Sequence, residues 1–335
     1  MRFGAVPLVD AQGAILAHSV QVQAGRLRKG RVLSADDLAA LQEAGLSEIT
    51  VARLDPGDVE ENAAAMRLAQ ALVPDPRGAG LTVQEAFTGR VNIRADRRGV
   101  VLLDAEAVHR LNAVDPMITL ATVPPMQRSW PGMMVGTVKI ISYGVDGAAL
   151  AQAEKVARGA MQVCPVSRHR ATLIVTEVAG RPVSAEDKGI RAVQGRLDAL
   201  GITLDALRIV PHEAGSIASA LRAAKGDLSL ILTASATSDI HDEAPAAVVA
   251  AGGEIARFGM PVDPGNLLFL GRIGTVPVIG LPGCARSPAL NGADWVLERI
   301  ACGLAVEAGD IAAMGVGGLL KEIPQRPQPR AGRST

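Results

Sequence analysis

The sequence predicts an α/β protein whose main domain is a doubly wound, mostly parallel sheet. Helical patterns separate short apolar runs, and the clearest of them spans 185–201, with apolar residues three to four apart until Gly201. Strands that alternate with helices favour a parallel sheet, so we expect this domain over residues 165–305. The expected strands are 172–176, 207–210, 228–232 and 276–281.

Three segments of this domain carry polar residues next to an apolar run. They read ILTASATSDIHD, MPVDPGNLLFLG and VIGLPGCARSP. The carboxyl ends of parallel strands meet at one edge of an open sheet, where ligands of doubly wound folds bind. We therefore expect the functional site along that edge.

Smaller domains are expected before the sheet domain. Residues 1–75 predict a small α+β domain in which Ser34 caps one helix and a second helix, from about Asp58 to Leu72, closes the fold. The segment PDPRGAG that follows predicts a linker. Residues 81–147 predict a β-rich domain, 148–164 a connecting helix, and 306–335 a tail with an extended Pro- and Arg-rich linker.

Composition excludes several classes of function. The formal net charge is zero and the chain has four Phe, two Trp and one Tyr, which argues against a nucleic-acid partner. No run approaches the 18 or so apolar residues of a membrane span, and the first residues lack a signal-peptide pattern. Three dispersed cysteines favour a reduced cytoplasmic setting over a zinc site.

From about Leu173 to Pro288, the Ser/Thr-rich turn with its Asp, the Pro-Gly turn and the Leu-Pro-Gly turn resemble a known domain family. This is the molybdopterin-binding domain of molybdopterin molybdotransferases and adenylyltransferases. The stretch AILAHSVQVQAGRLRKGRVLSADDLAALQEAGLSEITVARL also resembles a region of the molybdotransferases. The resemblance covers most of the chain, and it is closer still to the amino-terminal region of bacterial proteins whose carboxy-terminal half is a cytidylyltransferase-like domain, joined by a similar Pro- and Arg-rich linker.

The resemblance implies a protein of molybdenum cofactor biosynthesis. It would hold or deliver molybdopterin, or a nucleotide adduct of it, to a cytidylyltransferase domain or partner after residue 335. Two alternatives stay open: a Mg²⁺-dependent adenylyltransferase or molybdotransferase, and an assembly module whose site has lost its activity. Enzymes of the family are oligomers, so a homodimer through the amino-terminal zones is expected.

The turn after the third expected strand departs from the enzyme pattern. Where the enzymes carry Ser-Gly-Gly, this chain has Thr233, Ala234 and Ser235, whose Cβ atoms narrow the approach to a phosphate. Hydroxyls can still donate hydrogen bonds to a phosphate or a pterin carbonyl. The hydroxyls in question belong to Thr233, Ser235, Thr237 and Ser238.

Asp239 and Asp242 are the candidate catalytic and magnesium-binding residues. Asp242 stands where the enzymes place the second Asp of an acidic pair, whereas Ile240 replaces the first. Mg²⁺ is usually held by one or two carboxylates together with substrate phosphates. The alternative is that both residues cap the following helix, and the two roles are compatible.

Two further turns are candidates for binding the cofactor. Asp263 and Asn266 flank Pro264-Gly265 where the enzymes carry lysines, which reverses the local attraction for an anion by on the order of 1 kcal/mol. Pro264-Gly265 is also explained by a type II turn alone. The best anion candidate is the turn Pro282, Gly283, Cys284, Arg286 and Ser287, whose amides can form a nest beside the Arg286 charge. Cys284 is also explained as a small buried filler.

The loops after the first two expected strands supply the remaining candidates. Thr176 and Glu177 end a strand, and Lys188 stands near a position that faces the ligand in the enzymes. Ser184 and Asp187 together predict a capping box for the next helix. His212 follows the second strand, where it either lines the site or is solvated.

Overall fold

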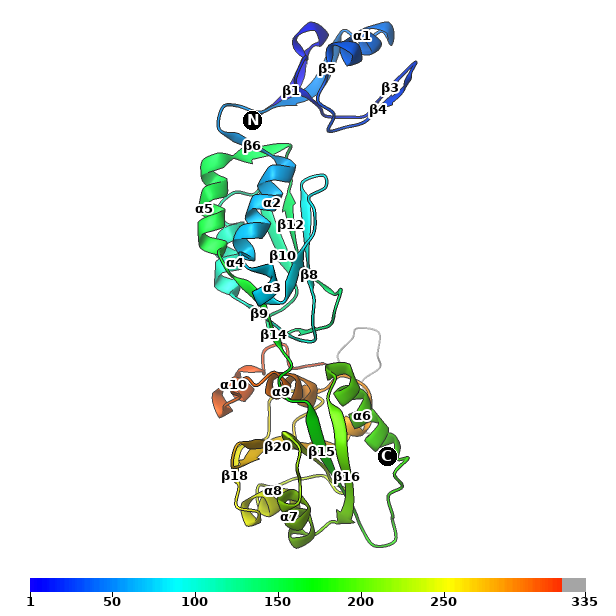
Figure 1. Ribbon diagram of the computed structural model, residues 1–335, viewed down its shortest axis with the longest axis vertical. Coiled ribbons are helices and arrows are strands. Elements are labelled where there is room, and N and C mark those ends of the chain that lie inside the picture. Colours follow the sequence, from blue (N-terminus) through cyan, green and yellow to red (C-terminus); the bar gives the residue numbers. More distant parts are fainter. Residues whose placement is uncertain (321–335) are drawn as a thin grey trace, which may run out of the picture. The chain divides into compact units, whose positions relative to one another are not determined.

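The computed structural model describes residues 1–320. Contacts divide the described chain into two compact units, Met1–Arg97 with Val101–Cys164, and Arg98–Val100 with residues 165–320 (Figure 1). No helix within residues 1–320 has the length and hydropathy needed to cross a bilayer.

The first unit begins with a three-stranded sheet of order β1-β5-β2. Ser34 caps α1 as predicted, in a capping box with Asp37, and Leu41 of this helix is fully buried. The elements of this part are β1 (Arg2–Pro7), η1 (Leu8–Asp10), β2 (Ile15–Leu16), β3 (Val20–Val22), β4 (Gly25–Leu27), α1 (Ala35–Glu43) and β5 (Glu48–Arg53).

A second core in this unit contains three helices and an antiparallel sheet of order β10-β12-β8-β7. The elements are β6 (Asp58–Glu60), α2 (Glu61–Leu72), α3 (Pro76–Ala79), β7 (Leu81–Val83), β8 (Arg90–Ala95), β9 (Gly99–Leu103), α4 (Ala105–Asn112), β10 (Ile118–Thr122), β11 (Arg128–Ser129), β12 (Met134–Ile140), β13 (Gly144–Asp146), α5 (Gly147–Ala157) and β14 (Met161–Pro165).

The packing of this core corrects two expectations. We expected α2 to close the amino-terminal domain, but its residue Leu68 shares a cluster with Ile93 of β8. The predicted connecting helix is α5, and Leu150 places it in the same cluster. An apolar stripe shows that a helix is buried but not against which sheet, so the sequence pattern did not decide either assignment. The predicted linker also contains the short helix α3, capped by Asp75.

The second unit is built on a six-stranded mixed sheet of order β16-β15-β17-β20-β19-β18. The first four strands are parallel, at the predicted positions, whereas β19 is antiparallel to both neighbours. The elements are β15 (Arg170–Glu177), α6 (Lys188–Leu200), β16 (Thr203–Pro211), α7 (Ala214–Arg222), β17 (Leu228–Leu232), α8 (Glu243–Ala250), β18 (Glu254–Phe258), β19 (Phe269–Ile273), β20 (Val276–Leu281), η2 (Gly283–Arg286), α9 (Gly292–Ala301) and α10 (Ala308–Ala313).

Helices cover both faces of this sheet. Residues of α6, α9 and α10 pack with one set of strand residues, and residues of α7 and α8 pack with the alternate set (Figure 1). The chain leaves β15 through α6 to reach β16 on one side, then returns through α7 to β17 on the other. The strand order therefore reverses between β15 and β17, which is the position of a ligand crevice in open α/β sheets.

The predicted tail from residue 306 is wrong in its first half. Ile311 of α10 and Met314 are buried in the same core as α6 and α9, so residues up to 320 belong to the folded unit. The Pro- and Arg-rich sequence that predicted a linker lies outside the described residues.

Candidate functional site

The candidate site lies at the carboxyl edge of the six-stranded sheet, where the chain leaves β15, β16, β17 and β20. A buried threonine ties three of these strand ends together. Thr176, at the end of β15, is fully buried, and its Oγ1 accepts the Ala234 amide at 2.7 Å. The same Oγ1 lies 3.0 Å from His212 Nδ1, at the end of β16. The ends of β15, β16 and β17 are therefore joined by side-chain hydrogen bonds as well as by strand pairing.

Arg286 connects the turn after β20 to the same edge. Its Nη2 donates to the Thr233 carbonyl at 3.0 Å, and its Nη1 lies 3.3 Å from Asp187 Oδ1 at the start of α6. These bonds engage two of the five N–H groups of a guanidinium. Within the described chain, the remaining donors of this half-buried side chain are available to an anionic group.

The four hydroxyls of the turn after β17 divide into two pairs. Thr233 and Thr237 are buried, and the Thr233 hydroxyl donates to the Ser235 carbonyl at 2.6 Å. Ser235 and Ser238 are exposed. The buried pair shapes the turn, which leaves the two serines as the hydroxyls that can reach a ligand.

Asp242 caps α8, as one of its two interpretations predicts. Its Oδ1 accepts the Glu243 amide at 2.9 Å and its Oδ2 accepts the Ser238 amide at 3.1 Å. Asp239 does not cap the helix, because its Oδ1 accepts the His241 amide at 2.8 Å within the preceding turn. Three of the four carboxylate oxygens thus accept backbone amides. Among residues 1–320, no group of three or more His, Cys, Asp or Glu side chains is placed to hold a metal ion.

The Pro264-Gly265 turn also lies at this edge of the sheet. It lies in the loop that joins the antiparallel strands β18 and β19, and this loop is at the same edge as the end of β20. Gly265 has φ 144°, far from the roughly 80° of a type II turn, so that explanation is wrong. The Pro264 carbonyl accepts the Gly292 amide at 2.8 Å, whereas Asn266 Nδ2 lies 3.5 Å from the carbonyl of Met260 in its own loop.

The turn Pro282–Ser287 forms the short 3₁₀ helix η2 with two flanking residues. The amides of Ala285 and Ser287 bond to carbonyls inside the turn, which reduces the number of amides that a nest could offer. Cys284 is half-buried and Gly283 is exposed. Arg286 is therefore the principal donor of this turn.

The loop before α6 corrects the predicted capping box. The helix is capped by Asp187, whose Oδ1 accepts the Gly189 amide at 2.7 Å, and Ser184 Oγ instead accepts the Glu186 amide at 3.1 Å. Lys188 is the first residue of α6 and is exposed. A Cβ at Gly189 would lie 2.9 Å from Arg286 Cγ, so the start of α6 lies against Arg286.

A hollow of about 420 Å³ opens beside this edge, between the loops that follow β15 and β16. Glu177 Oε2 accepts the Val183 amide at 2.9 Å and thereby holds the first loop closed on itself. The residues that line the hollow are Glu177, Val178, Ala179, Gly180, Pro182, Pro211, His212 and Glu213. His212 thus lines a pocket, which favours the first of its two interpretations.

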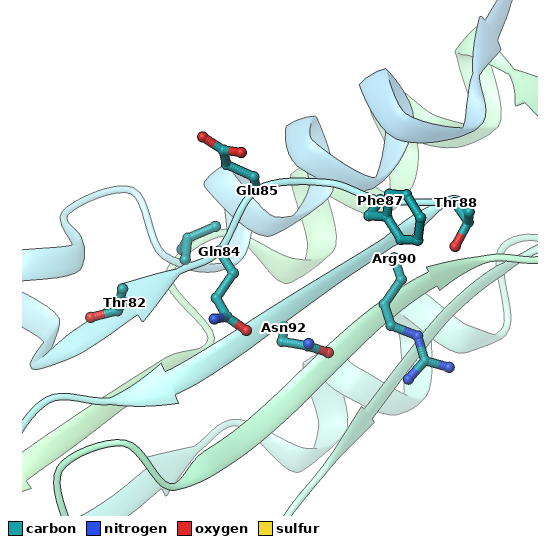
Figure 2. A pocket seen from close by; sticks show the side chains of 8 residues that line it. Thr82, Gln84, Glu85, Phe87, Thr88, Arg90 and Asn92 are labelled. Carbon is teal, nitrogen blue, oxygen red and sulfur yellow. The ribbon is translucent and has the colours of Figure 1, made fainter.

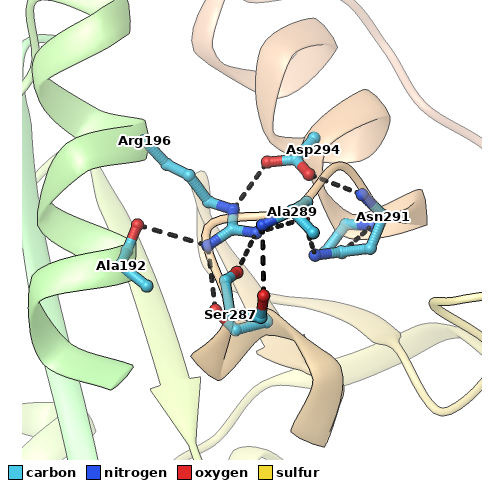
Figure 3. Close-up of polar contacts among 8 residues, drawn as sticks. Ala192, Arg196, Ser287, Ala289, Asn291 and Asp294 are labelled. Carbon is cyan, nitrogen blue, oxygen red and sulfur yellow. Dashed lines mark hydrogen bonds and ion pairs between the residues drawn. The ribbon is translucent and has the colours of Figure 1, made fainter. Parts of the chain in front are cut away.

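The structure also shows a supporting network that sequence reasoning missed (Figure 3). Arg196 of α6 is 7% exposed, and its Nε donates to Asp294 Oδ1 at 2.6 Å. Its other nitrogens donate to carbonyls of its own helix and of the turn after β20, those of Ala192, Ala285, Ser287 and Ala289. One buried guanidinium therefore holds the backbone on both sides of Arg286. The only sequence signal is its spacing, three residues after Val193 on the apolar side of the helix.

A larger hollow of about 850 Å³ lies in the first unit, on the β7–β8 hairpin (Figure 2). It is lined by Thr82, Val83, Gln84, Glu85, Phe87, Thr88, Arg90 and Asn92. All these residues come from one hairpin and the loop within it. The smaller hollow beside β15 joins loops from separate strands next to a topological switch point, so it is the better candidate on architectural grounds.

Residues 5–53 match the family model DUF8806, which is described as a domain of unknown function. No curated protein matches this chain. A crystal structure of a molybdopterin biosynthesis moea protein from Pyrococcus horikosii aligns with 15% identity and a TM-score of 0.32, covering 90% of this chain and 76% of that one. A structure of molybdenum cofactor biosynthesis protein B aligns with 16% identity and a TM-score of 0.30, covering 41% and 95%. At these scores, neither likeness defines a function for this chain.

Proposed function

We propose that this chain binds molybdopterin, or a nucleotide adduct of it, at the carboxyl edge of a doubly wound sheet. It holds the cofactor or delivers it to a cytidylyltransferase domain or partner. A homodimer and a cytoplasmic location belong to the same proposal. The observation that carries the proposal is the convergence of the loops after β15, β16, β17 and β20 at the switch point, joined by Thr176 and Arg286.

The residues at this edge support a phosphate-bearing ligand. Arg286 carries a guanidinium with N–H groups that make no hydrogen bond within the described chain. Charge-assisted hydrogen bonds from a guanidinium match the geometry of phosphate oxygens. Lys188 and the exposed hydroxyls of Ser235 and Ser238 lie on the loops that join Arg286 at the same edge. The proposed site therefore combines a guanidinium paired with Asp187, an exposed lysine and small polar donors.

The environments of Asp242 and Asp263 favour a binding role over catalytic turnover. Asp242 uses both oxygens to cap α8 and to hold the turn before it. Asp263 and Asn266 occupy the Pro-Gly turn where the resembling enzymes carry lysines. A carboxylate beside an anionic substrate opposes its binding, which argues against molybdate insertion by that route.

The experiment that tests this proposal is titration of anaerobically prepared molybdopterin into the purified chain, with and without Mg²⁺. We expect a Kd of about micromolar or tighter, a loss of at least about tenfold in Arg286→Ala, and no dependence on Mg²⁺. The matched control is Arg272→Ala, which removes an exposed arginine paired with Glu254 near the opposite end of β20.

Other results separate the alternatives. Mg²⁺-dependent turnover with ATP or molybdate would contradict the carrier role and establish the enzyme alternative. A folded chain that does not bind molybdopterin would leave the assembly module as the explanation. Equal losses in Arg286→Ala and Arg272→Ala would place the ligand elsewhere.

A further inference from the structure

We infer that His212 is a hydrogen-bond donor to the ligand through Nε2–H, and that Thr176 fixes its ring in this tautomer. The inference rests on the proposed function in one respect, that the ligand occupies the hollow beside Glu177. It adds a residue, a protonation pattern and a ligand chemistry for that part of the site.

The argument begins with the hydrogen bonds of one buried hydroxyl. Thr176 Oγ1 accepts the Ala234 amide at 2.7 Å, and an amide N–H can only donate, so the oxygen is the acceptor in this bond. The hydroxyl retains one proton of its own. Since Thr176 is fully buried, that proton needs an acceptor, and a buried hydroxyl without one is costly.

Within the described chain, His212 Nδ1 is the acceptor at hand, at 3.0 Å from Thr176 Oγ1. If Nδ1 carried the proton, the Thr176 oxygen would accept twice and its own proton would have no partner. With no proton on Nδ1, the Ala234 amide, the Thr176 hydroxyl and His212 Nδ1 each have a hydrogen-bond partner. A neutral imidazole with a bare Nδ1 carries its proton on Nε2.

The backbone fixes the position of the ring as well. The His212 amide donates to the Glu177 carbonyl at 2.8 Å, which extends the pairing of β16 with β15 by one residue. The side chain is half-buried and lines the hollow of about 420 Å³. Since Nδ1 and the His212 amide are both hydrogen-bonded, Nε2–H is the polar group of this residue's ring that remains for a ligand.

This donor defines the chemistry of the ligand atom that it meets. An N–H group calls for an oxygen or nitrogen with a free lone pair, which on molybdopterin is a phosphate oxygen or the ring carbonyl. The same hollow is lined by Glu177 and Glu213, and one oxygen of the Glu177 carboxylate accepts the Val183 amide. Two carboxylates repel a phosphate but can accept hydrogen bonds from the N–H groups next to a ring carbonyl. The ring carbonyl is therefore the better partner for His212.

The tautomer can be read without any ligand. Nitrogen NMR of the chain labelled with ¹⁵N-histidine, at about pH 8.5, shows which ring nitrogen carries no proton. We expect His212 to have a bare Nδ1 in the unmodified chain and in Thr176→Ser, and to become a mixture of tautomers in Thr176→Val. The matched control is Thr172→Val on the same strand, because the Thr172 hydroxyl is buried and bonds to nothing within the described chain. A protonated Nδ1, or an unchanged ring in Thr176→Val, would overturn the inference.

Binding then tests the donor role. We expect His212→Phe to lower the affinity for molybdopterin by about tenfold, which corresponds to one lost hydrogen bond of about 1.4 kcal/mol. The affinity of His212→Gln should stay within about threefold of that of the unmodified chain. Pterin, which has no phosphate, and inorganic phosphate are titrated separately. We expect pterin to shift the His212 nitrogen signals and inorganic phosphate to leave them unchanged. Equal affinity in His212→Phe would overturn the donor role. A folded chain with the expected tautomer that binds no molybdopterin would overturn the proposed function instead.

Discussion

Arg196 and Asp294 form a buried ion pair, with 2.6 Å between Nε and Oδ1 and side chains that are only 7% and 9% exposed. They lie on α6 and α9, and the other Asp294 oxygen accepts the Asn291 amide at 2.8 Å. The guanidinium also donates to carbonyls of the turn after β20 (Figure 3). The pair thus supports the turn that carries Arg286.

Removing one partner of this pair should be strongly destabilising. Asp294→Ala leaves the Arg196 charge buried without its counter-ion, and we expect the free energy of unfolding of the second unit to fall by about 3–5 kcal/mol. The double variant Arg196→Met with Asp294→Leu should recover only part of this loss, because it removes both charges but leaves the carbonyls that Arg196 binds without their donor. Urea unfolding followed by Trp295 fluorescence, in a Trp130→Phe background, measures the second unit alone.

The exposed pair Arg272–Glu254 is the matched control for that prediction. Its N–O distance is 2.7 Å, close to that of the buried pair, but both side chains are 62% exposed. Arg272→Ala should therefore cost less than about 1 kcal/mol. Similar losses for Asp294→Ala and Arg272→Ala would show that burial does not determine the cost of breaking the Arg196–Asp294 pair.

Asp242 should contribute to stability as a helix cap. Asp242→Ala removes the acceptor for two amides, and we expect a loss of about 1 kcal/mol in the same unfolding experiment. Asp242→Ser keeps a capping oxygen and should stay within about 0.5 kcal/mol. If molybdopterin binding required Mg²⁺ and Asp242→Ser abolished it, a metal role would have to be added to the cap.

Asp227 should make the stability of the second unit depend on acid pH. The His169 amide, at 2.7 Å, and the Arg170 amide, at 3.2 Å, donate to its carboxylate and lower the pKa of Asp227. Since the pKa is lower in the folded state, this stabilisation is fully present above the unfolded pKa of about 3.9 and is lost as the pH falls toward the folded pKa.

The check is Asp227→Asn, which removes the charge and keeps the shape. We expect it to be less stable than the unmodified chain by about 1 kcal/mol at pH 7, because the carboxylate is partly exposed and its bonds are screened by water. The difference should shrink as the pH falls below about 5. A difference that does not change between pH 7 and pH 3 would contradict the assigned cause.

Gly280 on β20 should not tolerate a side chain. A Cβ there would lie 1.9 Å from the Phe269 ring, and Phe269 is 1% exposed on the neighbouring strand. We expect Gly280→Ala to cost about 1–3 kcal/mol in the unfolding experiment. In contrast, Gly195→Ala in α6 meets no atom within 4 Å and should stabilise by up to about 1 kcal/mol. A neutral Gly280→Ala would show that Phe269 can move.

The parallel part of the sheet could be predicted because its strands are apolar runs. Leu228–Leu232 is buried at every position, and the predicted stop of α6 at Gly201 is confirmed by its φ of 76°. The antiparallel strands could not be separated from loops in the same way. The strand Glu254–Phe258 alternates between exposed and half-buried positions, a pattern that a loop next to Gly and Pro residues shares.

The sequence predicts a candidate site along one edge of the sheet, but not the contacts within it. Strand ends are local features, so Thr176 and Thr233 were placed correctly at the ends of their strands. The contact between Arg196 and Asp294 joins residues 98 positions apart and has no local signal. The Thr176–His212 contact likewise depends on which strands are neighbours in the sheet, and the sequence pattern leaves that order open.

The most direct test of the proposed site is amide hydrogen exchange of the whole chain with and without molybdopterin. Binding at the carboxyl edge predicts slower exchange in 176–183, 233–238 and 283–287, because the ligand would cover these loops. It predicts no change in 82–92, which line the hollow on the β7–β8 hairpin (Figure 2). Protection confined to 82–92, with molybdopterin bound, would contradict the proposed site.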